Sequence, residues 1–236
     1  PISIENTDFD LIPLHCLPIR EKDNTKPYFL NSIPKKLVDN VIKTLTEANL
    51  ELHLLDIGYS SLERLAITSI NKLKESEVFI LIELSLECTH FYIISHSGPI
   101  YISTLTAIRA FETQENYQGE LSIEEDTINN QDYLAISDLD LKVLFKEGRE
   151  EINNFKIKYN LEIKEILLSG INSSHPGINN LFEDSLKIKT NILRSMSSID
   201  IGDISLSKPI VMQDLNRVNG LALSMLQADD HEQEDE

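Results

Sequence analysis

The chain has 236 residues, of which 41% are hydrophobic, and a formal net charge of −18. This length suits one substantial core, or two small lobes that share a cleft. The negative charge argues against nucleic acid and anionic lipid as main partners, because both require a cationic surface. No run of eighteen apolar residues occurs, so the sequence predicts no membrane-spanning helix.

The acidic residues are concentrated in two segments. Residues 112–132 contain no Lys or Arg, and residues 228–236 form an acidic tail. We expect the tail to be disordered and the first segment to be an insertion in the fold. The N-terminal residues lack the basic and apolar regions of a signal peptide.

The two cysteines, Cys16 and Cys88, lie far apart in the sequence, and each sits in an apolar run. This pattern favours buried free thiols in a reducing cytoplasm, with a disulfide or a metal site as the alternative. The histidines show no metal-ligand spacing, so we predict no metal.

The first quarter of the chain reads as a strand–strand–helix–strand unit. Residues 8–16 and 28–33 are predicted strands, and Pro34 opens a helix at its favoured first position. Residues 51–57 are predicted as a third strand. The helix has an apolar stripe at helical spacing, formed by Leu37, Val38, Val41, Ile42 and Leu45.

A second helix follows the turn at Gly58, where Ser60 and Ser61 are candidate caps. Residues 77–109 then read as three consecutive strands with a turn at residues 95–99. Such a meander begins a ribonuclease-H-like half. Residues 113–131 are polar and acidic, which indicates a reduced subdomain or a mobile loop.

The rest of the chain alternates helices and strands. A helix is predicted over residues 138–159, with Gly148 as an interruption, and a buried strand over 164–169. A short helix, a strand over 187–193 and a linker over 195–211 follow. Asp214 is expected to cap the last helix, whose inward stripe would be Val218, Leu221, Ala222 and Met225. The whole order is that of an α/β, ribonuclease-H-like fold.

Four stretches in consistent order carry a resemblance that spans residues 1–227. They are residues 1–12, residues 37–65 ending in LLDIGYSSLER, the meander ending at residues 101–111, and residues 165–178 with the sequence EILLSGINSSHPGI. Together they resemble the type IV pilus assembly protein PilM family, actin-like relatives of the cell-division protein FtsA. The resemblance implies an actin-like fold with a small 1C-like subdomain at 1–57 and a larger lobe at 58–227.

The nucleotide motifs of that family are degenerate here. Its second phosphate loop, D-I-G-x-x-x-T, matches Glu83 to Thr89, where only Thr89 is retained and Ser85 replaces the glycine. Glu87 adds a second carboxylate, which electrostatically opposes a phosphate. The family's adenosine turn keeps Gly170, but Ile171 would narrow the purine slot.

Glu83, Ser85, Thr89 and Gly170 are therefore the candidate, degenerate nucleotide positions. Glu83 and Glu87 are also explained as polar residues on strand edges, and His175 as a helix-entry residue. We expect no catalytic residue and no cofactor. ATP would bind only if a segment upstream completes the site, since the family's first phosphate loop lies before Pro1.

The resemblance implies a cytoplasmic scaffold, peripheral to the inner membrane, in the type IV pilus assembly complex. It would bind the cytoplasmic tail of a PilN-like bitopic membrane protein and other pilus assembly proteins, without nucleic acid and without inserting into the membrane. The alternatives are a nucleotide-binding actin-like ATPase, or a related scaffold of cell division or type II secretion.

Overall fold

The computed structural model describes residues 7–13, 28–70, 73–85, 87–108, 136–193 and 216–224. The predictions for Cys16, the acidic insertion, the 195–211 linker, the Asp214 cap and the acidic tail lie outside the described residues. Within the described ranges, no helix is both long enough and apolar enough to cross a membrane.

A five-stranded sheet forms the centre of the molecule, in the order β5-β4-β3-β6-β7. The three meander strands pair antiparallel, and β6 lies parallel to both β3 and β7. This arrangement confirms the predicted meander and the predicted buried strand over residues 164–169, which pairs on both sides as β6. The strands are β3 (Glu77–Leu84), β4 (Thr89–Ser95), β5 (Gly98–Leu105), β6 (Glu162–Ser169) and β7 (Thr190–Ile192).

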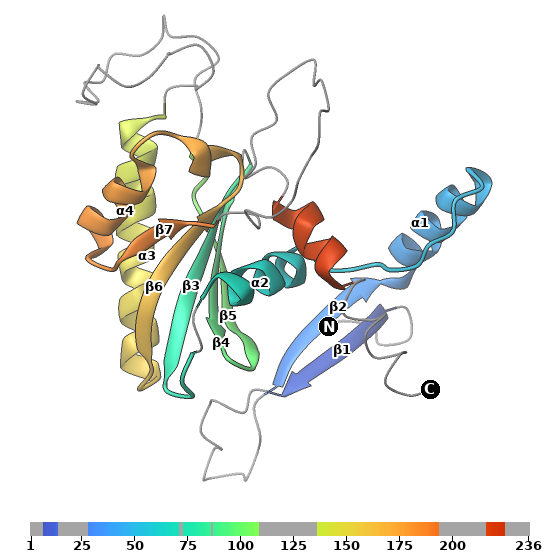
Figure 1. Ribbon diagram of the computed structural model, residues 1–236, viewed down its shortest axis with the longest axis horizontal. Coiled ribbons are helices and arrows are strands. Elements are labelled where there is room, and N and C mark those ends of the chain that lie inside the picture. The colour runs from blue at the N-terminus through green and yellow to red at the C-terminus, as the bar shows by residue number, and fades with distance from the viewer. Residues whose placement is uncertain are drawn as a thin grey trace, which may run out of the picture.

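Helices cover both faces of this sheet (Figure 1). On one face lie α3 (Asp138–Lys158) and α4 (Ile178–Leu186); on the other lie α2 (Gly58–Ser69) and a helix at residues 216–224. Because successive strand residues point to opposite faces, each strand contributes to two cores. In β3, for example, Ile80 and Ile82 belong to the first core, whereas Phe79 and Leu81 belong to the second.

Helix α3 runs unbroken through Gly148, where the sequence suggested an interruption. The glycine is buried, and a Cβ there would meet Leu186 of the first core at an ordinary contact distance of 3.7 Å. Tertiary packing of one helix face therefore outweighs the low helix propensity of one glycine.

The N-terminal unit stands apart from the sheet (Figure 1). It consists of β1 (Thr7–Pro13), paired antiparallel with β2 (Tyr28–Pro34), and of α1 (Lys35–Glu47). The predicted third strand at residues 51–57 is wrong, because these residues form no strand. Pro34 ends β2 and serves as the N-cap of α1 rather than as its first residue.

The 51–57 prediction failed because alternating apolar residues make a strand only where a neighbouring strand offers backbone partners. In the described residues, β1 and β2 form a two-stranded sheet of their own, and no third strand joins it. The unit contacts the lobe through Asn31, whose side-chain oxygen accepts a 2.6 Å hydrogen bond from the Tyr59 hydroxyl, and through Phe29, whose ring centroid lies 6.0 Å from that of Tyr59.

The last helix, at residues 216–224, faces the opposite way from the predicted stripe. Val218 is 61% exposed and Leu221 is 36% exposed, whereas Asn216 and Gly220 are buried. The reason is close packing: a Cβ on Gly220 would lie 1.9 Å from the Ser61 carbonyl oxygen. Only the small and polar side of this helix fits so near to α2.

Candidate functional site

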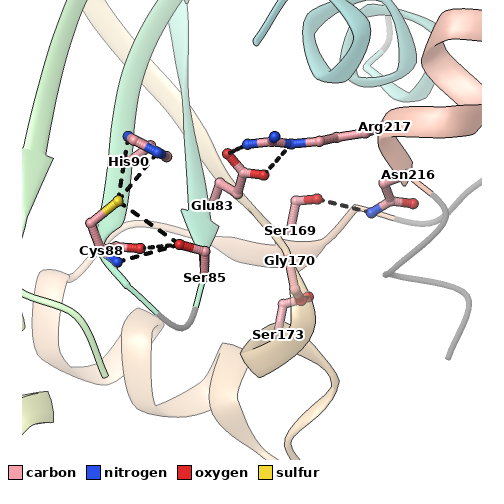
Figure 2. A network of polar contacts seen from close by, with 9 residues as sticks. All are labelled: Glu83, Ser85, Cys88, His90, Ser169, Gly170, Ser173, Asn216 and Arg217. Atoms are coloured by element: carbon pink, nitrogen blue, oxygen red, sulfur yellow. Dashed lines mark hydrogen bonds and ion pairs between the residues drawn. The ribbon is translucent and has the colours of Figure 1, made fainter. Parts of the chain in front are cut away.

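Polar residues gather where β3 and β6 end side by side. Glu83 and Ser169 are register partners on the adjacent parallel strands, and Gly170 follows directly. Figure 2 shows these residues together with Arg217 and Asn216 from the 216–224 helix. In parallel α/β sheets, this carboxyl end of the strands is where ligands usually bind.

Glu83 is bound at this edge by an arginine. Both carboxylate oxygens accept hydrogen bonds from Arg217, from Nε at 2.6 Å and from Nη2 at 2.6 Å. Glu83 is only 4% exposed, while half of the Arg217 side chain reaches solvent. The hydrogen bonds from Arg217 to Glu83 raise the pKa of Arg217, against the effect of its partial burial. The pair is a bidentate, charge-assisted contact.

Asn216 fixes the same helix to the sheet edge. Its Nδ2 donates to Ser169 Oγ at 3.0 Å and to the Leu193 carbonyl at 3.1 Å. Arg64 on α2 donates from Nε to the Gly220 carbonyl at 3.2 Å. The 216–224 helix is therefore held at both its start and its middle, and it places Arg217 over the end of β3.

The candidate phosphate loop is a tight turn between β3 and β4. Its closing bonds come from Ser85, whose hydroxyl donates to the Cys88 carbonyl at 2.6 Å and whose N–H donates to the same oxygen at 3.3 Å. The Ser85 hydroxyl therefore stabilises its own turn, and its proton is already donated within that turn. Glu87, the second carboxylate, is exposed.

Thr89 and Gly170 are the other two candidate nucleotide positions at this edge. Thr89 is fully buried; by alternation from His90, which shares a face with Glu83, it faces the α3 side of the sheet. Its Oγ1 makes no hydrogen bond to any described residue. Gly170 has φ +87°, and a Cβ there would lie 2.6 Å from the Leu84 carbonyl oxygen, so glycine is required.

Three of the four candidate nucleotide positions, Glu83, Ser85 and Gly170, therefore come together at one edge, while Thr89 faces away from Glu83. Ile171, expected to narrow a purine slot, is 42% exposed in the turn after Gly170. His175 begins the turn before α4, and burial lowers its pKa. The described residues hold no group of three His, Cys, Asp or Glu side chains that could bind a metal.

Sequence reasoning missed Arg217 and Asn216. A signal was present, since Asn216, Asn219 and Gly220 recur at the i, i+3, i+4 spacing of one helix face. The sequence instead predicts that the apolar stripe of this helix faces inward, and that stripe, which comprises Val218, Leu221, Ala222 and Met225, does not include Asn216 or Arg217. The strongest charged contact at the sheet edge thus joins residues that are 134 positions apart.

No family model matches the sequence, and no curated protein matches it. Among solved structures, the chain is similar to one titled "PilM-PilN type IV pilus biogenesis complex", with a TM-score of 0.63 and 17% identity over 94% of this chain and 67% of that chain. A weaker similarity is found to the ethanolamine utilization protein EutJ from Carboxydothermus hydrogenoformans, with a TM-score of 0.46 and 12% identity over 78% of this chain and 60% of that chain. The similarity to MreB5 of Spiroplasma citri bound to ADP has a TM-score of 0.47 and 14% identity, over 80% of this chain and 64% of that chain.

The first of these similarities confirms the fold that the sequence predicted. The chain has an α/β, actin-like fold of the PilM kind.

Proposed function

We propose that this protein is a scaffold of the type IV pilus assembly machinery and that it binds the cytoplasmic tail of a PilN-like bitopic membrane protein. The observation that carries the proposal is the shared fold with the PilM–PilN complex over 94% of this chain. The proposed place of action is the cytoplasmic face of the inner membrane, reached through that partner and through other pilus assembly proteins.

The sheet edge supports a scaffold better than an enzyme. Glu83 is already neutralised by Arg217, and the Ser85 hydroxyl already closes its own turn. A bound nucleotide would have to compete with both arrangements, and the exposed Glu87 would repel its phosphates. We therefore propose that the protein acts without a nucleotide and without hydrolysing ATP.

The alternative is nucleotide binding at the same edge, which a specific observation favours. The Gly170 turn brings its backbone close to Leu84, and the buried Thr89 Oγ1 has no hydrogen-bond partner among the described residues. An unsatisfied buried hydroxyl is unfavourable, so a ligand or a water molecule there would stabilise it.

The N-terminal unit offers the apolar surface that a partner peptide needs. On the β1–β2 hairpin, Leu11 and Leu30 are cross-strand partners, and each is about half exposed at 50% and 51%. On α1, Leu37 is 52% exposed and Ile42 is 44% exposed, and the helix has no buried residue. Covering such side chains would supply binding free energy.

The charge at this surface is small compared with that of the whole chain. Residues 7–13 and 28–57, which form the N-terminal unit and its link to α2, contain three Lys and six Asp or Glu, which gives a net charge of −3. Of the net −18, thirteen negative charges come from residues 112–132 and 228–236, seven from the first segment and six from the second. A Lys- and Arg-rich tail would therefore be steered by distant charge and anchored here by apolar contact.

Surface plasmon resonance with a peptide from the tail of the cognate PilN-like protein tests this proposal. Each of Leu37→Ser and Ile42→Ser is expected to weaken binding about fivefold, since roughly 1 kcal/mol of apolar burial would be lost. The matched control is Ile157→Ser on α3, an 86% exposed apolar residue on the far side of the sheet, which should leave binding unchanged.

Raising the salt concentration should slow association more than it speeds dissociation, because screening shortens the range of steering. If Ile157→Ser weakened peptide binding as much as the α1 variants do, the binding site would not be on α1. No binding by the parent chain would refute the scaffold proposal. Calorimetry with ATP and magnesium decides the alternative: saturable binding that disappears in Thr89→Val would establish a nucleotide site.

A further inference from the structure

A cysteine and a histidine meet beside the Glu83–Arg217 pair. Cys88 Sγ lies 3.3 Å from His90 Nε2, within hydrogen-bonding reach for sulfur, and Figure 2 shows the two side chains directed toward each other. The residues are two apart at the start of β4, so they share a face of the strand.

The turn holds the sulfur in this position. Besides accepting from Ser85, the Cys88 backbone donates its N–H to Ser85 Oγ at 3.4 Å. The Cys88 peptide is thus fixed at both its donor and its acceptor. Both Cys88 and His90 are half-buried rather than enclosed.

The charged and titratable groups around the pair come from three elements. Glu83 on β3 is the cross-strand partner of His90, Tyr92 follows on β4 with its ring centroid 5.9 Å away, and Arg217 lies on the 216–224 helix. Figure 2 shows the Arg217 guanidinium bound to Glu83 beside the Cys88–His90 pair. Since Glu83 is bound on both oxygens by Arg217, its repulsion of a thiolate is partly offset.

We propose that Cys88 is a nucleophilic thiol, that His90 accepts its proton, and that the site is modified by low-molecular-mass disulfides. The thiolate is the reactive form of cysteine, and an adjacent imidazole is the group that commonly generates it. In the reaction, the Cys88 thiol passes its proton to His90 Nε2 and the sulfur attacks one sulfur of the disulfide. The disulfide bond breaks, a mixed disulfide forms on Cys88, and the departing thiolate takes the proton from His90.

The test uses 4,4′-dithiodipyridine, a neutral disulfide whose released thiopyridone absorbs light. The parent for this experiment is Cys16→Ser, which leaves Cys88 as the single thiol of the chain. At pH 7 it is expected to react at least about tenfold faster than the Cys16→Ser/His90→Gln variant, the low end of what a positioned base contributes. Cys16→Ser/Cys88→Ser is the blank.

The matched control is His96→Gln in the same background, an exposed histidine in the next turn, which should react at the parent rate. A second measurement needs no change at His90. The parent rate should rise between about pH 5.5 and 7.5, where an imidazole titrates, instead of near pH 8.5 as for an unassisted thiol. Equal rates in parent and His90→Gln, or a parent rate that rises only near pH 8.5, would overturn the proposal.

Discussion

The sheet lobe buries its large apolar side chains, whereas the N-terminal unit leaves many of its apolar side chains exposed. In the lobe, large residues such as Phe79, Phe91 and Phe182 are at most 1% exposed and belong to two packed cores. In the N-terminal unit, α1 buries no residue, and Leu11 and Leu30 remain half exposed. Burial on this scale is the main stabilising contribution in proteins, so the lobe provides the stability of the fold.

Aromatic contacts join the two regions. Phe29 of β2 meets Tyr59 of α2 edge to face, and Tyr59 in turn meets Tyr92 of β4, with centroids 6.0 Å apart in both pairs. The difference between the regions indicates a division of roles: changes in the lobe should affect folding, and changes in the unit should affect binding.

The same substitution, leucine to alanine, should have a large effect in the lobe and a small one in the N-terminal unit. Leu168→Ala, at a fully buried position of β6, should lower the free energy of unfolding by about 2–5 kcal/mol. Leu37→Ala on α1 should change it by less than about 0.5 kcal/mol, as expected for an exposed position. Urea unfolding followed by circular dichroism measures both, since the chain has no tryptophan. A similar loss in both variants would contradict the division of roles.

Two glycines in the lobe should respond differently to substitution by alanine. Gly220→Ala puts a methyl group 1.9 Å from the Ser61 carbonyl, so the 216–224 helix must move, and overpacking of this kind costs about 1–3 kcal/mol. Gly148→Ala is the matched control, because its methyl group fits at ordinary contact distance inside α3. It should raise the free energy of unfolding by about 0.5–1 kcal/mol. Equal effects in the two variants would show that the helix is not packed against α2.

The Glu83–Arg217 pair should contribute less than the glycine contact. Glu83→Gln removes the charge of a buried carboxylate, but Arg217 is half exposed and solvent can screen it. We therefore expect a loss of about 1–2 kcal/mol in the free energy of unfolding, below the cost of breaking a fully buried pair. In a double-mutant cycle with Arg217→Met, the two losses should not add. Additive losses would show that the two side chains act independently.

The sequence predicted the parts of the fold in which local pattern and tertiary packing agree. The short apolar run of β6 was correctly predicted as a buried strand, and the helical periodicity of α3 was correct even across Gly148. The predicted strand over residues 164–169 also placed Gly170 directly after its end, where the structure requires a glycine.

What could not be predicted depended on partners far away in the chain. Residues 51–57 alternate like a strand but have no strand to pair with. The 216–224 helix buries its polar side, because α2 approaches too closely for anything larger than Gly220. The pairing of Arg217 with Glu83 could not be predicted either, because the two residues are 134 positions apart and form no local sequence pattern. The sequence therefore predicted the site residues at the strand ends, but it missed those that come from the 216–224 helix.

The smallest expected effect concerns Glu63 on α2, near the boundary between the two regions. Burial raises the pKa of Glu63 from 4.5 to about 7, which the neighbouring Arg64 opposes and Asp56 reinforces. Asp56 belongs to the segment that joins the N-terminal unit to α2, and it is paired with Arg64. A change in the position of that segment would therefore change the pKa of Glu63.

The sign follows from proton linkage. Between about pH 4.5 and 7 the folded chain holds a proton on Glu63 that the unfolded chain has lost, so this group's contribution to stability falls as the pH rises. We expect a loss of about 1 kcal/mol across that range after allowing for solvent screening. In Glu63→Gln the proton is no longer exchanged, so the difference in free energy of unfolding between variant and parent should grow from pH 5 to pH 7 and then stay constant. Urea unfolding at pH 5, 6, 7 and 8 measures this difference, and the other titrating groups cancel because both chains share them. A difference that is the same at all four pH values would show that Glu63 titrates as an ordinary exposed carboxylate, and that the segment before α2 does not bury it.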